Sequence, residues 1–461
     1  MRWRLVAVAG LLGAAAVAQP TIASPSAPVP HGVVAVIDTG INPYNVVFRD
    51  RSAAAYRYPG SYLPGFPKNV PALRLTLDAP SYKAALAKDC TRVWAHVKTG
   101  QLYWIPGTKI VGAITFRPTM TAACAGLATS SILDTYWHGT MTASRAVASG
   151  YGACPDCRIV VVQAIDGFGI NNMEEASQAA IKGLQFAAAN SGWIDADTNS
   201  WGATTPYDPT GRTGLFSASP ALIRAVEKAS TSHLSFYASG NGAANANLPP
   251  PRTTLGFGQV TPSAIVVGGI DSGHMLSWPN VPVHLAADAC DDFGASNTST
   301  TLSSPTIGGG TSAATPYTGG GAVRELMTAR RLLGDSGTGV HGGVVARGRP
   351  GLVRAGPLAD GILTVAEWRR VLLATATTRP AAEPTDGPTC PNALAKWSDV
   401  PAGFPEWTLI GYGSVDTPAR SAAAAVYAGT AMLPDRTATD AFFTVRDAAV
   451  TAQYTAYTAV P

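Results

Sequence analysis

The chain has 461 residues, of which 46% are hydrophobic and 13% charged, and its formal net charge is +4. This apolar content excludes a chain that is disordered along most of its length, because it can bury a sizeable core. No run of Lys and Arg is present, so the sequence argues against nucleic acid as a partner. The length allows one large catalytic domain or two to three smaller ones.

The N-terminus has the features of a secretory signal peptide. Arg2 and Arg4 precede an apolar stretch from Leu5 to Ala18 that is too short to span a bilayer comfortably, and small residues suited to cleavage follow. We therefore predict a signal peptide over residues 1–23, release outside the cell and no stable membrane insertion, with an uncleaved anchor as the alternative.

Short continuous apolar runs alternate with helical patterns along the chain. The runs cover residues 33–37, 159–162, 234–238 and 265–267, and the helical patterns cover residues 173–189 and 220–229. Continuous rather than alternating hydrophobicity predicts strands that are buried on both faces, as in a parallel sheet. The sequence therefore predicts an α/β fold with a mostly parallel central sheet, whose sites form beyond the carboxyl ends of the strands.

Two segments interrupt this alternation. Residues 50–108 are rich in Tyr, Pro and Trp and predict a long surface insertion, and residues 334–361 are rich in Gly and Arg and predict an exposed loop. Thr364 and Glu367 then form a capping box, which predicts a helix after Thr364. Residues 431–461 form a polar, Ala/Thr-rich tail whose role the sequence does not indicate.

The six cysteines fit an exported protein, because an even number in an oxidising compartment favours disulfides. They are Cys90, Cys124, Cys154, Cys157, Cys290 and Cys390. For Cys154 and Cys157 we favour a small loop closed by a local disulfide over a redox or half-zinc motif, since two further zinc ligands are not evident. The remaining pairing stays open.

Three short blocks carry candidate catalytic side chains. Asp38 directly follows the first apolar run, His138 lies in a Trp-His-Gly-Thr turn, and Ser312 lies between a Gly-rich run and Ala-Ala-Thr-Pro316. Pro316 is tolerated in the first turn of a helix, so it places Ser312 at a helix start, where N–H groups suit an oxyanion. Taken singly, the blocks are explained by a capping aspartate, a lone histidine and a Gly/Ser-rich loop. Together they supply a nucleophile, a base and an orienting carboxylate for peptide hydrolysis.

The three blocks resemble, in the order Asp, His, Ser, the active-site signatures of the subtilisin-like serine protease family, the subtilases. The resemblance spans residues 32–424 and implies a three-layer α/β/α fold, with a peptidase domain over residues 24–430. It also implies a secreted serine endopeptidase that acts on protein or peptide substrates. Asp38, His138 and Ser312 form the catalytic triad in this interpretation.

Further segments are similar to the same family. The Ala-Ser-Gly-Asn241-Gly block resembles the oxyanion-hole block and implies Asn241 as a side-chain donor. Ser200, Trp201 and Gly202 lie in a block that resembles the strand that pairs with substrate and borders the specificity pocket. These two blocks are similar to the proprotein-processing branch, which cleaves after basic residues, but the pocket carboxylates for that specificity cannot be placed in the sequence.

Four features depart from the family pattern. Ser24 and Asp38 leave no room for a folded propeptide, and the step from Asp38 to His138 is long because of the first insertion. Glycines 319–321 fall in the helix after Ser312, where each costs about 0.5–1 kcal/mol relative to alanine. Residues 285–288 replace the turn that usually precedes the serine block. These departures weigh against efficient catalysis.

Two alternatives stay open: a catalytically impaired member of the fold that acts as a binding or scaffold protein, and a serine-carboxyl peptidase with a glutamate base. The His138 block argues against the second. No cofactor is required for the chemistry and no metal site is predicted. Structural calcium is allowed, with Asp288, Asp291 and Asp292 as the best cluster, although a solvated loop explains these three more simply. The oligomeric state is not predicted.

Overall fold

The structure is a computed structural model that describes most of the chain between residues 32 and 376. The described residues are 32–117, 124, 132–165, 173–202, 219–240, 261–270, 276–278, 283–289, 294–301, 309–348, 360–376, 415, 444, 447–452, 454–455 and 458–459. The expected signal peptide, Asn241, Asp291, Asp292, Cys290 and Cys390 lie outside these residues.

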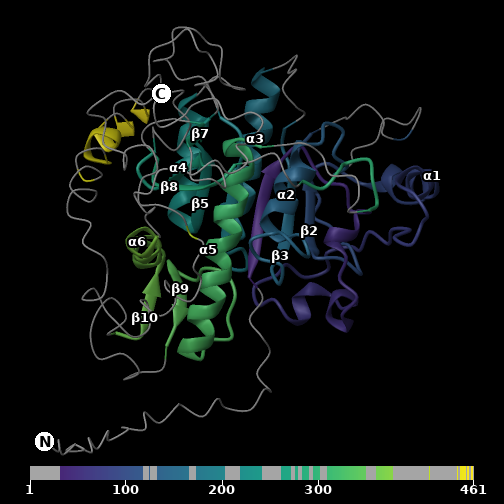
Figure 1. The fold of residues 1–461 in the computed structure, drawn as a ribbon, viewed down its shortest axis with the longest axis horizontal. Helices are drawn as coiled ribbons and strands as arrows, with labels where there is room; N and C mark the ends of the chain where they lie inside the picture. Colours follow the sequence, from purple (N-terminus) through teal and green to yellow (C-terminus); the bar gives the residue numbers. More distant parts are fainter. Residues whose placement is uncertain are drawn as a thin grey trace, which may run out of the picture.

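A mostly parallel sheet forms the centre of the molecule (Figure 1). In spatial order its strands are β2 (Ile110–Thr115), β3 (Arg158–Gln163), β1 (Val33–Asp38), β4 (Ala196–Asn199), β5 (Leu234–Ala238), β6 (Ile265–Ile270) and β7 (Leu276–Trp278), with β8 (Leu285–Asp288) also paired to β6. Of these strands only β7 runs antiparallel to its neighbour. Every residue of β1, β2 and β3 is buried, as their continuous Val- and Ile-rich sequences predict.

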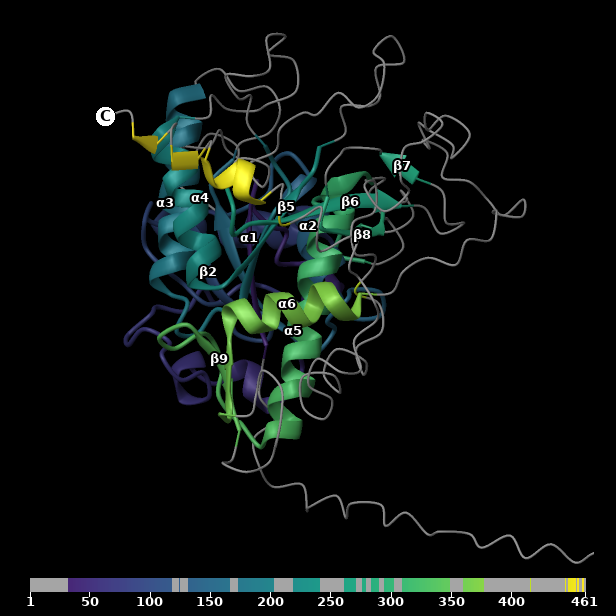
Figure 2. The same ribbon diagram turned by 90° about the vertical axis from the view of Figure 1, so that its left-hand side faces the viewer.

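Helices cover both faces of the sheet, which gives three layers (Figures 1 and 2). Val34 and Val36 of β1 belong to the core cluster that contains α2 (His138–Val147) and α5 (Thr311–Leu333). Val33, Ala35 and Ile37 of β1 belong to the cluster that contains residues of α3 (Met173–Ala189) and α4 (Pro220–Ser232). The expected α/β/α architecture and the expected strands and helices are therefore confirmed.

The expected capping box is present at α6 (Val365–Thr375). The Thr364 hydroxyl accepts from the Glu367 N–H at 3.2 Å, and the Glu367 carboxylate accepts from the Thr364 N–H at 2.8 Å. These two bonds satisfy N–H groups that have no partner within the helix, so they fix where α6 begins.

The glycines of α5 have a packing role that the sequence did not indicate. A Cβ atom at Gly319 would lie 2.4 Å from Thr198 Cγ2, and one at Gly320 would lie 2.6 Å from the Ala146 carbonyl oxygen. Side chains at these positions would hold α5 away from β4 and α2. The cost of glycine in a helix is therefore offset here by close packing around the helix that begins with Ser312.

The first insertion is more than a surface loop. It contains α1 (Tyr82–Arg92) and the short 3-10 helices η2 (Ala53–Tyr56), η3 (Pro59–Ser61) and η4 (Trp94–His96), and η1 (Val46–Phe48) lies just before it. Trp94 is fully buried and donates from Nε1 to the Tyr44 hydroxyl at 2.9 Å. A disulfide joins Cys90 of α1 to Cys124, in the chain leading to His138. The insertion is therefore packed against the domain.

The second irregular segment also differs from the expected loop in its described part. β9 (Val344–Arg347) and β10 (Ile362–Thr364) form a separate two-stranded antiparallel sheet, in which Val345 and Ala346 are buried. Arg330 of α5 donates from Nε to the Val345 carbonyl at 2.8 Å. Burial of β9 against α5 makes this part of the segment ordered structure, while residues 349–359 lie outside the description.

Two further expectations concern the cysteines and the membrane. Cys154 and Cys157 form the expected local disulfide. None of the helices that the structure describes combines the length and apolar character needed to cross a bilayer. The predicted boundaries of the peptidase domain and of the tail stay predictions.

Candidate active site

Asp38 and His138 form a buried pair where β1 ends and α2 begins. Asp38 is 2% exposed and His138 is 4% exposed, and Nδ1 of the imidazole lies 2.8 Å from Oδ1 of the carboxylate. The Thr39 N–H donates to the same oxygen at 2.7 Å, and the Thr142 hydroxyl lies within hydrogen-bond distance of both Oδ2, at 3.2 Å, and the Gly139 carbonyl oxygen, at 3.1 Å. The Thr39 N–H and the imidazole thus hold one carboxylate oxygen, which orients the ring.

The surroundings favour the protonated form of His138. Burial disfavours the imidazolium and acts in the opposite direction, but the charge of Asp38, its hydrogen bond and the charge of Asp134 together raise the pKa of His138 above its usual value of about 6.5. An imidazole with a raised pKa is a stronger base, which suits a group that has to accept a proton.

Asp134, which the sequence analysis did not single out, organises the turn before His138. Its carboxylate is 3% exposed and accepts five hydrogen bonds. The donors are Thr39 Oγ1 at 2.9 Å, the N–H groups of Tyr136 at 3.0 Å, Trp137 at 2.8 Å and Thr140 at 2.7 Å, and Thr140 Oγ1 at 2.6 Å. Trp137 has a left-handed backbone with φ of 97°, which is strained for a bulky residue. The bonds to Asp134 hold this conformation and with it the direction of His138.

The Asp38 turn and the His138 turn are in direct contact. The Gly139 N–H donates to Thr39 Oγ1 at 2.8 Å, and a Cβ atom at Gly139 would lie 2.3 Å from the Gly40 carbonyl oxygen. A side chain at position 139 would therefore push the two turns apart. The glycine that follows His138 permits the distance at which Asp38 reaches the imidazole.

Ser312 lies in the first turn of α5 and is 8% exposed. Gly310 precedes the helix with φ of 77°, a conformation that favours glycine, and turns the chain into the helix. Pro316 lies one turn later than expected; because it has no N–H, the Ser312 carbonyl receives no helical hydrogen bond from it. The Ser200 hydroxyl donates to that carbonyl at 2.9 Å instead, and the Ser312 hydroxyl donates to the Ser200 carbonyl at 3.3 Å.

The segment after β4 joins Ser312 to Asp38. Trp201 follows Ser200 and donates from Nε1 to the carbonyl of Ile37, the residue before Asp38, at 2.7 Å. The Ser200 and Trp201 side chains are buried, whereas Gly202 is half-buried. Their role in binding substrate stays a prediction, and the positions of these side chains leave the backbone of this segment as the part that could contact a peptide.

The carboxyl ends of β1 and β4 thus bring Asp38, His138, Ser200 and Ser312 to one edge of the sheet, which we call the carboxyl edge. Ala238 ends β5, the strand beside β4, at the same edge. Asn241 follows three residues later and lies outside the described residues, so its expected position near Ser312 is untested.

The structure offers no metal site in its described part. Among those residues no group of three or more His, Cys, Asp or Glu side chains is placed to hold an ion. Asp288, the one member of the calcium candidate that is described, lies 3.7 Å from Arg145 Nη2. Structural calcium stays an untested expectation.

The chain is similar to a solved structure titled "Crystal structure of a cold adapted subtilisin-like serine proteinase", at 18% identity and a TM-score of 0.39. The similarity covers 78% of this chain and 87% of the other. No curated protein matches it. The model of the family described as "Subtilase family" matches residues 31–329, which include all three blocks. The chain therefore belongs to the subtilase family of serine endopeptidases.

Proposed function

We propose that this protein is a secreted endopeptidase that cleaves peptide bonds through the triad Asp38, His138 and Ser312. The observation that carries the proposal is the buried 2.8 Å contact between Asp38 and His138, at the same edge of the sheet as Ser312. A serine at a helix start, a buried imidazole and a buried carboxylate are the groups that acyl transfer by a serine requires.

In the proposed reaction, His138 first acts as a general base. The Ser312 hydroxyl leaves the Ser200 carbonyl, gives its proton to Nε2 of His138 and attacks the carbonyl carbon of the scissile bond. Asp38 holds the proton on Nδ1, which leaves Nε2 as the accepting atom and stabilises the imidazolium that forms. His138 then gives its proton to the leaving amine, and the acyl group on Ser312 is released by water.

The developing oxyanion requires hydrogen-bond donors. The backbone N–H of Ser312 lies in the first turn of α5, where N–H groups have no acceptor within the helix, and the positive end of the helix dipole favours a negative charge. We assign the second donor to the side chain of Asn241 on the family resemblance. Loss of one such donor typically costs about 100- to 1,000-fold in kcat.

Secretion is supported by the expected signal peptide together with the disulfides. Arg2, Arg4 and the apolar stretch after them match an export signal, and the disulfides at Cys90–Cys124 and Cys154–Cys157 require an oxidising compartment to persist. The substrates we propose are proteins and peptides outside the cell.

One observation favours the alternative of a catalytically impaired member of the fold. A serine hydroxyl has a single proton, and in the structure that of Ser312 is donated to the Ser200 carbonyl. If this bond persists in the presence of substrate, Ser312 does not give its proton to His138. The protein then binds the substrate without cleaving it.

Labelling with a fluorophosphonate probe separates the two functions. We expect the purified chain to form a covalent adduct and the Ser312→Ala variant to form none, with mass spectrometry placing the adduct on Ser312. Circular dichroism and a thermal unfolding midpoint serve as controls for folding of both proteins. A folded, monodisperse parent that is not labelled contradicts the triad assignment and favours the binding protein.

A further inference from the structure

A second candidate site lies at the edge of the sheet opposite to Ser312. A pocket of about 480 Å³ forms where β2 and β3 begin: Lys109 directly precedes β2, and Arg158 is the first residue of β3. Arg324 and Arg331 of α5 complete it. They follow Ser312 by 12 and 19 residues along one helix, which corresponds to about 18 Å and 28 Å. We call this site the amino-edge pocket.

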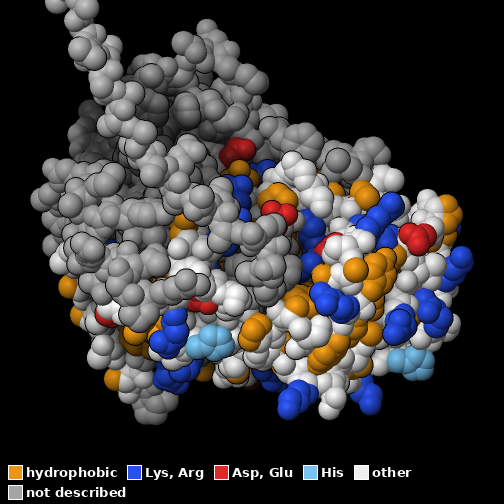
Figure 3. Space-filling view, turned by 90° about the horizontal axis from the view of Figure 1, so that it is seen from below, with side chains coloured by type: hydrophobic (Ala, Val, Ile, Leu, Met, Phe, Trp, Pro, Cys, Tyr) orange, Lys and Arg blue, Asp and Glu red, His pale blue; other side chains and the backbone are white. Residues whose placement is uncertain are grey.

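The amino-edge pocket concentrates positive charge. It is lined by two carboxylates, Asp50 and Asp156, and by six cations: Arg49, Arg51, Lys109, Arg158, Arg324 and Arg331. Asp50 forms an ion pair with Arg158, and Asp156 is exposed. The excess of positive over negative side chains in this pocket is four, which equals the net charge of +4 of the whole chain. Lys and Arg also predominate over Asp and Glu on the face of the molecule toward which α5 ends (Figure 3).

Several donors in the pocket lack acceptors. The Nε atoms of Arg49, Arg158 and Arg324 are buried and, within the described part of the chain, have no hydrogen-bond partner, although Nη2 of Arg49 donates to the Leu77 carbonyl and Nη1 of Arg158 donates to Asp50. Arg158 as a whole is only 5% exposed. A buried donor without an acceptor is costly, and a guanidinium is best satisfied by an oxyanion such as a carboxylate or a phosphate. The pocket is therefore suited to an anionic ligand.

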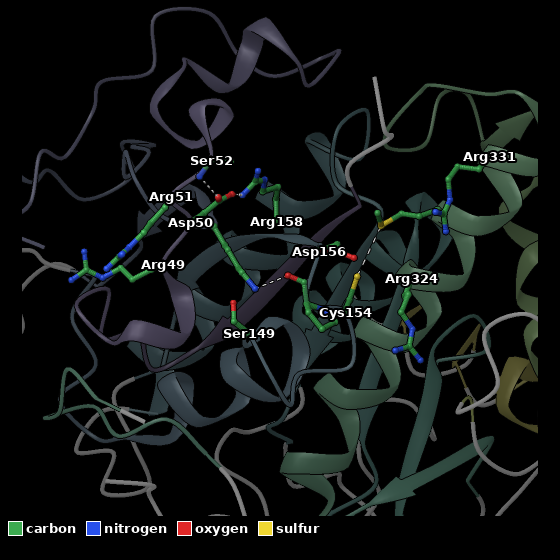
Figure 4. Close-up of a pocket in the computed structure, with 13 residues that line it drawn as sticks. Arg49, Asp50, Arg51, Ser52, Ser149, Cys154, Asp156, Arg158, Arg324 and Arg331 are labelled. Atoms are coloured by element: carbon green, nitrogen blue, oxygen red, sulfur yellow. Dashed lines mark hydrogen bonds and ion pairs between the residues drawn. The ribbon is translucent and has the colours of Figure 1, made fainter. Parts of the chain in front are cut away.

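The arrangement of the cations favours an extended ligand over a small one. Figure 4 shows Arg49 and Arg51 on one side of the pocket and Arg324 and Arg331 on the other, with Cys154 and Asp156 between them. The middle contains the exposed Asp156 carboxylate beside a buried apolar contact, in which the Cys154–Cys157 disulfide meets Met327 at Sγ–Sδ distances of 4.0 and 3.7 Å. An extended polypeptide carries carboxylates at intervals and offers aliphatic groups between them, whereas one small oxyanion reaches only one side.

We propose that the amino-edge pocket binds an acidic segment of a polypeptide, at a site separate from the one that contains Ser312. Carboxylates of the bound segment pair with Arg51 at one end and with Arg324 and Arg331 at the other. The intervening backbone lies over the disulfide and Met327.

Binding is tested without cleavage in the full-length Ser312→Ala variant. A fluorescein-labelled peptide of alternating Glu and Ala is titrated at low salt and followed by anisotropy. We expect saturable binding that weakens at least tenfold in the Arg324→Gln/Arg331→Gln variant, and that weakens with added salt because part of the pocket is exposed. Arg51→Gln, at an exposed position, removes a cation from the opposite side and is expected to weaken binding as well.

Matched controls separate the pocket from a general effect of charge. Lys83→Gln/Lys182→Gln removes the same charge at exposed positions outside the pocket and is expected to leave affinity unchanged. A peptide of alternating Gln and Ala is expected not to bind. Equal weakening by both double variants, or no saturation below 1 mM peptide, overturns the proposal. Displacement of the peptide by inorganic triphosphate at a lower concentration than by unlabelled peptide overturns the polypeptide assignment in favour of a phosphate site.

A second readout tests whether the pocket recruits substrates, and this part rests on the proposed function. With the active chain, a substrate that carries the acidic segment 12 residues from its cleavage site is compared with one that carries the Gln segment. We expect a KM at least fivefold lower for the acidic substrate at equal kcat, and loss of the difference in the Arg324→Gln/Arg331→Gln variant. Binding to the Ser312→Ala variant is measured independently, so a failure of proteolysis does not alter its outcome.

Discussion

Different charged groups are buried at the two edges of the sheet. At the carboxyl edge they include the carboxylates of Asp38 and Asp134, which hydroxyls and backbone N–H groups surround, and Arg117, which follows β2. At the amino edge the buried charged groups include Lys109, Arg158 and Arg330, which meet carboxylates and carbonyl oxygens. The mild net charge of the chain conceals this separation. One edge thus holds the buried Asp38–His138 pair, whereas buried cations predominate at the other.

The largest expected effect is at the carboxyl edge. Ser312→Ala removes the proposed nucleophile, and loss of this group in a serine protease lowers kcat on the order of 10⁶-fold. The hydroxyl makes only a 3.3 Å bond to the Ser200 carbonyl, so the free energy of unfolding is expected to change little. Peptide hydrolysis and denaturant titration check the two statements. An active Ser312→Ala protein contradicts the division of roles between the edges.

Asp38→Asn tests the electrostatic side of the same edge. Loss of the carboxylate removes the group that orients His138, and the expected decrease in kcat is about 10⁴-fold. The base must be neutral, so kcat/KM decreases as the pH falls below the pKa of His138. Because Asp38 raises that pKa, the acidic limb of the profile lies above its usual value of about 6.5 in the parent and moves to lower pH in the variant. An unmoved limb contradicts this assignment.

At the amino edge a single change is expected to affect stability alone. Arg330 is fully buried and pairs with Asp195 at 2.7 Å, and removing one member of a buried pair costs about 3–5 kcal/mol because the other charge is left without compensation. Arg330→Met is expected to lower the free energy of unfolding by this amount and to leave kcat/KM unchanged at a temperature where it is folded. Arg330→Met/Asp195→Asn is expected to lose less, since no uncompensated charge remains. A larger loss in the double variant speaks against the explanation.

Asp134→Asn tests a positioning residue at the carboxyl edge, because it alters the position of His138 without changing the reacting atoms. An amide presents N–H groups where the carboxylate accepted from Thr140, so the turn shifts. A small misplacement in an active site costs up to about 100-fold in rate. We expect kcat to fall by about 10- to 100-fold with little change in KM. Since the Asp134 charge also raises the pKa of His138, the acidic limb moves to lower pH, which a purely structural defect would not produce.

The smallest expected effect concerns Lys109. Lys109 is 5% exposed. Its ammonium group donates to the carbonyl oxygens of Val147 at 2.7 Å and Pro155 at 2.5 Å. Burial, and then the charge of Arg158, lower the pKa of Lys109 to about 8, although Asp156 and Asp50 act in the opposite direction. Between pH 8 and the usual lysine pKa of about 10.4 the unfolded chain binds more protons, so this group makes stability rise with pH.

Urea titrations of the parent and of Lys109→Met at pH 7.5 and pH 9.5 isolate that contribution. We expect the parent to gain more stability, or lose less, over this interval than the variant. Equal changes in the two proteins contradict the lowered pKa.

Much of the fold could be predicted because its central strands are apolar throughout. The sequence of β1 can be buried on both faces only in the middle of a layered structure, and Asp38 at its end is then placed at an edge. The start of α6 followed from the capping box at Thr364. The position of Ser312 in the first turn of α5 followed from the residues around it, although Pro316 lies in the second turn rather than the first.

The rest depends on contacts between distant residues. The role of Asp134 could not be recognised from the sequence, because one aspartate in a loop is ordinary. Its carboxylate accepts hydrogen bonds from the N–H groups two and three residues later, those of Tyr136 and Trp137, and this spacing is a turn signal that could have indicated the role. The packing of Trp94 against Tyr44 and the need for Gly319 beside Thr198 follow from tertiary approach, which local sequence does not encode. The amino-edge pocket likewise unites Arg51 with Arg331 across a span of sequence that no local pattern connects.

The tight seating of α5 determines how the two edges can communicate. Gly319 packs against Thr198 and Gly320 packs against Ala146 so closely that we expect α5 not to move along its axis. The helix then keeps the two sites at a fixed distance and does not transmit a movement between them. We therefore expect a ligand held at Arg331 to leave Ser312 in place, so that the gain from occupying both sites comes from tethering alone. The span of about 28 Å along the helix is the reach of about eight fully extended residues. A chain that follows the surface needs more, so a substrate with its acidic stretch next to the cleaved bond obtains no advantage from the distant arginines.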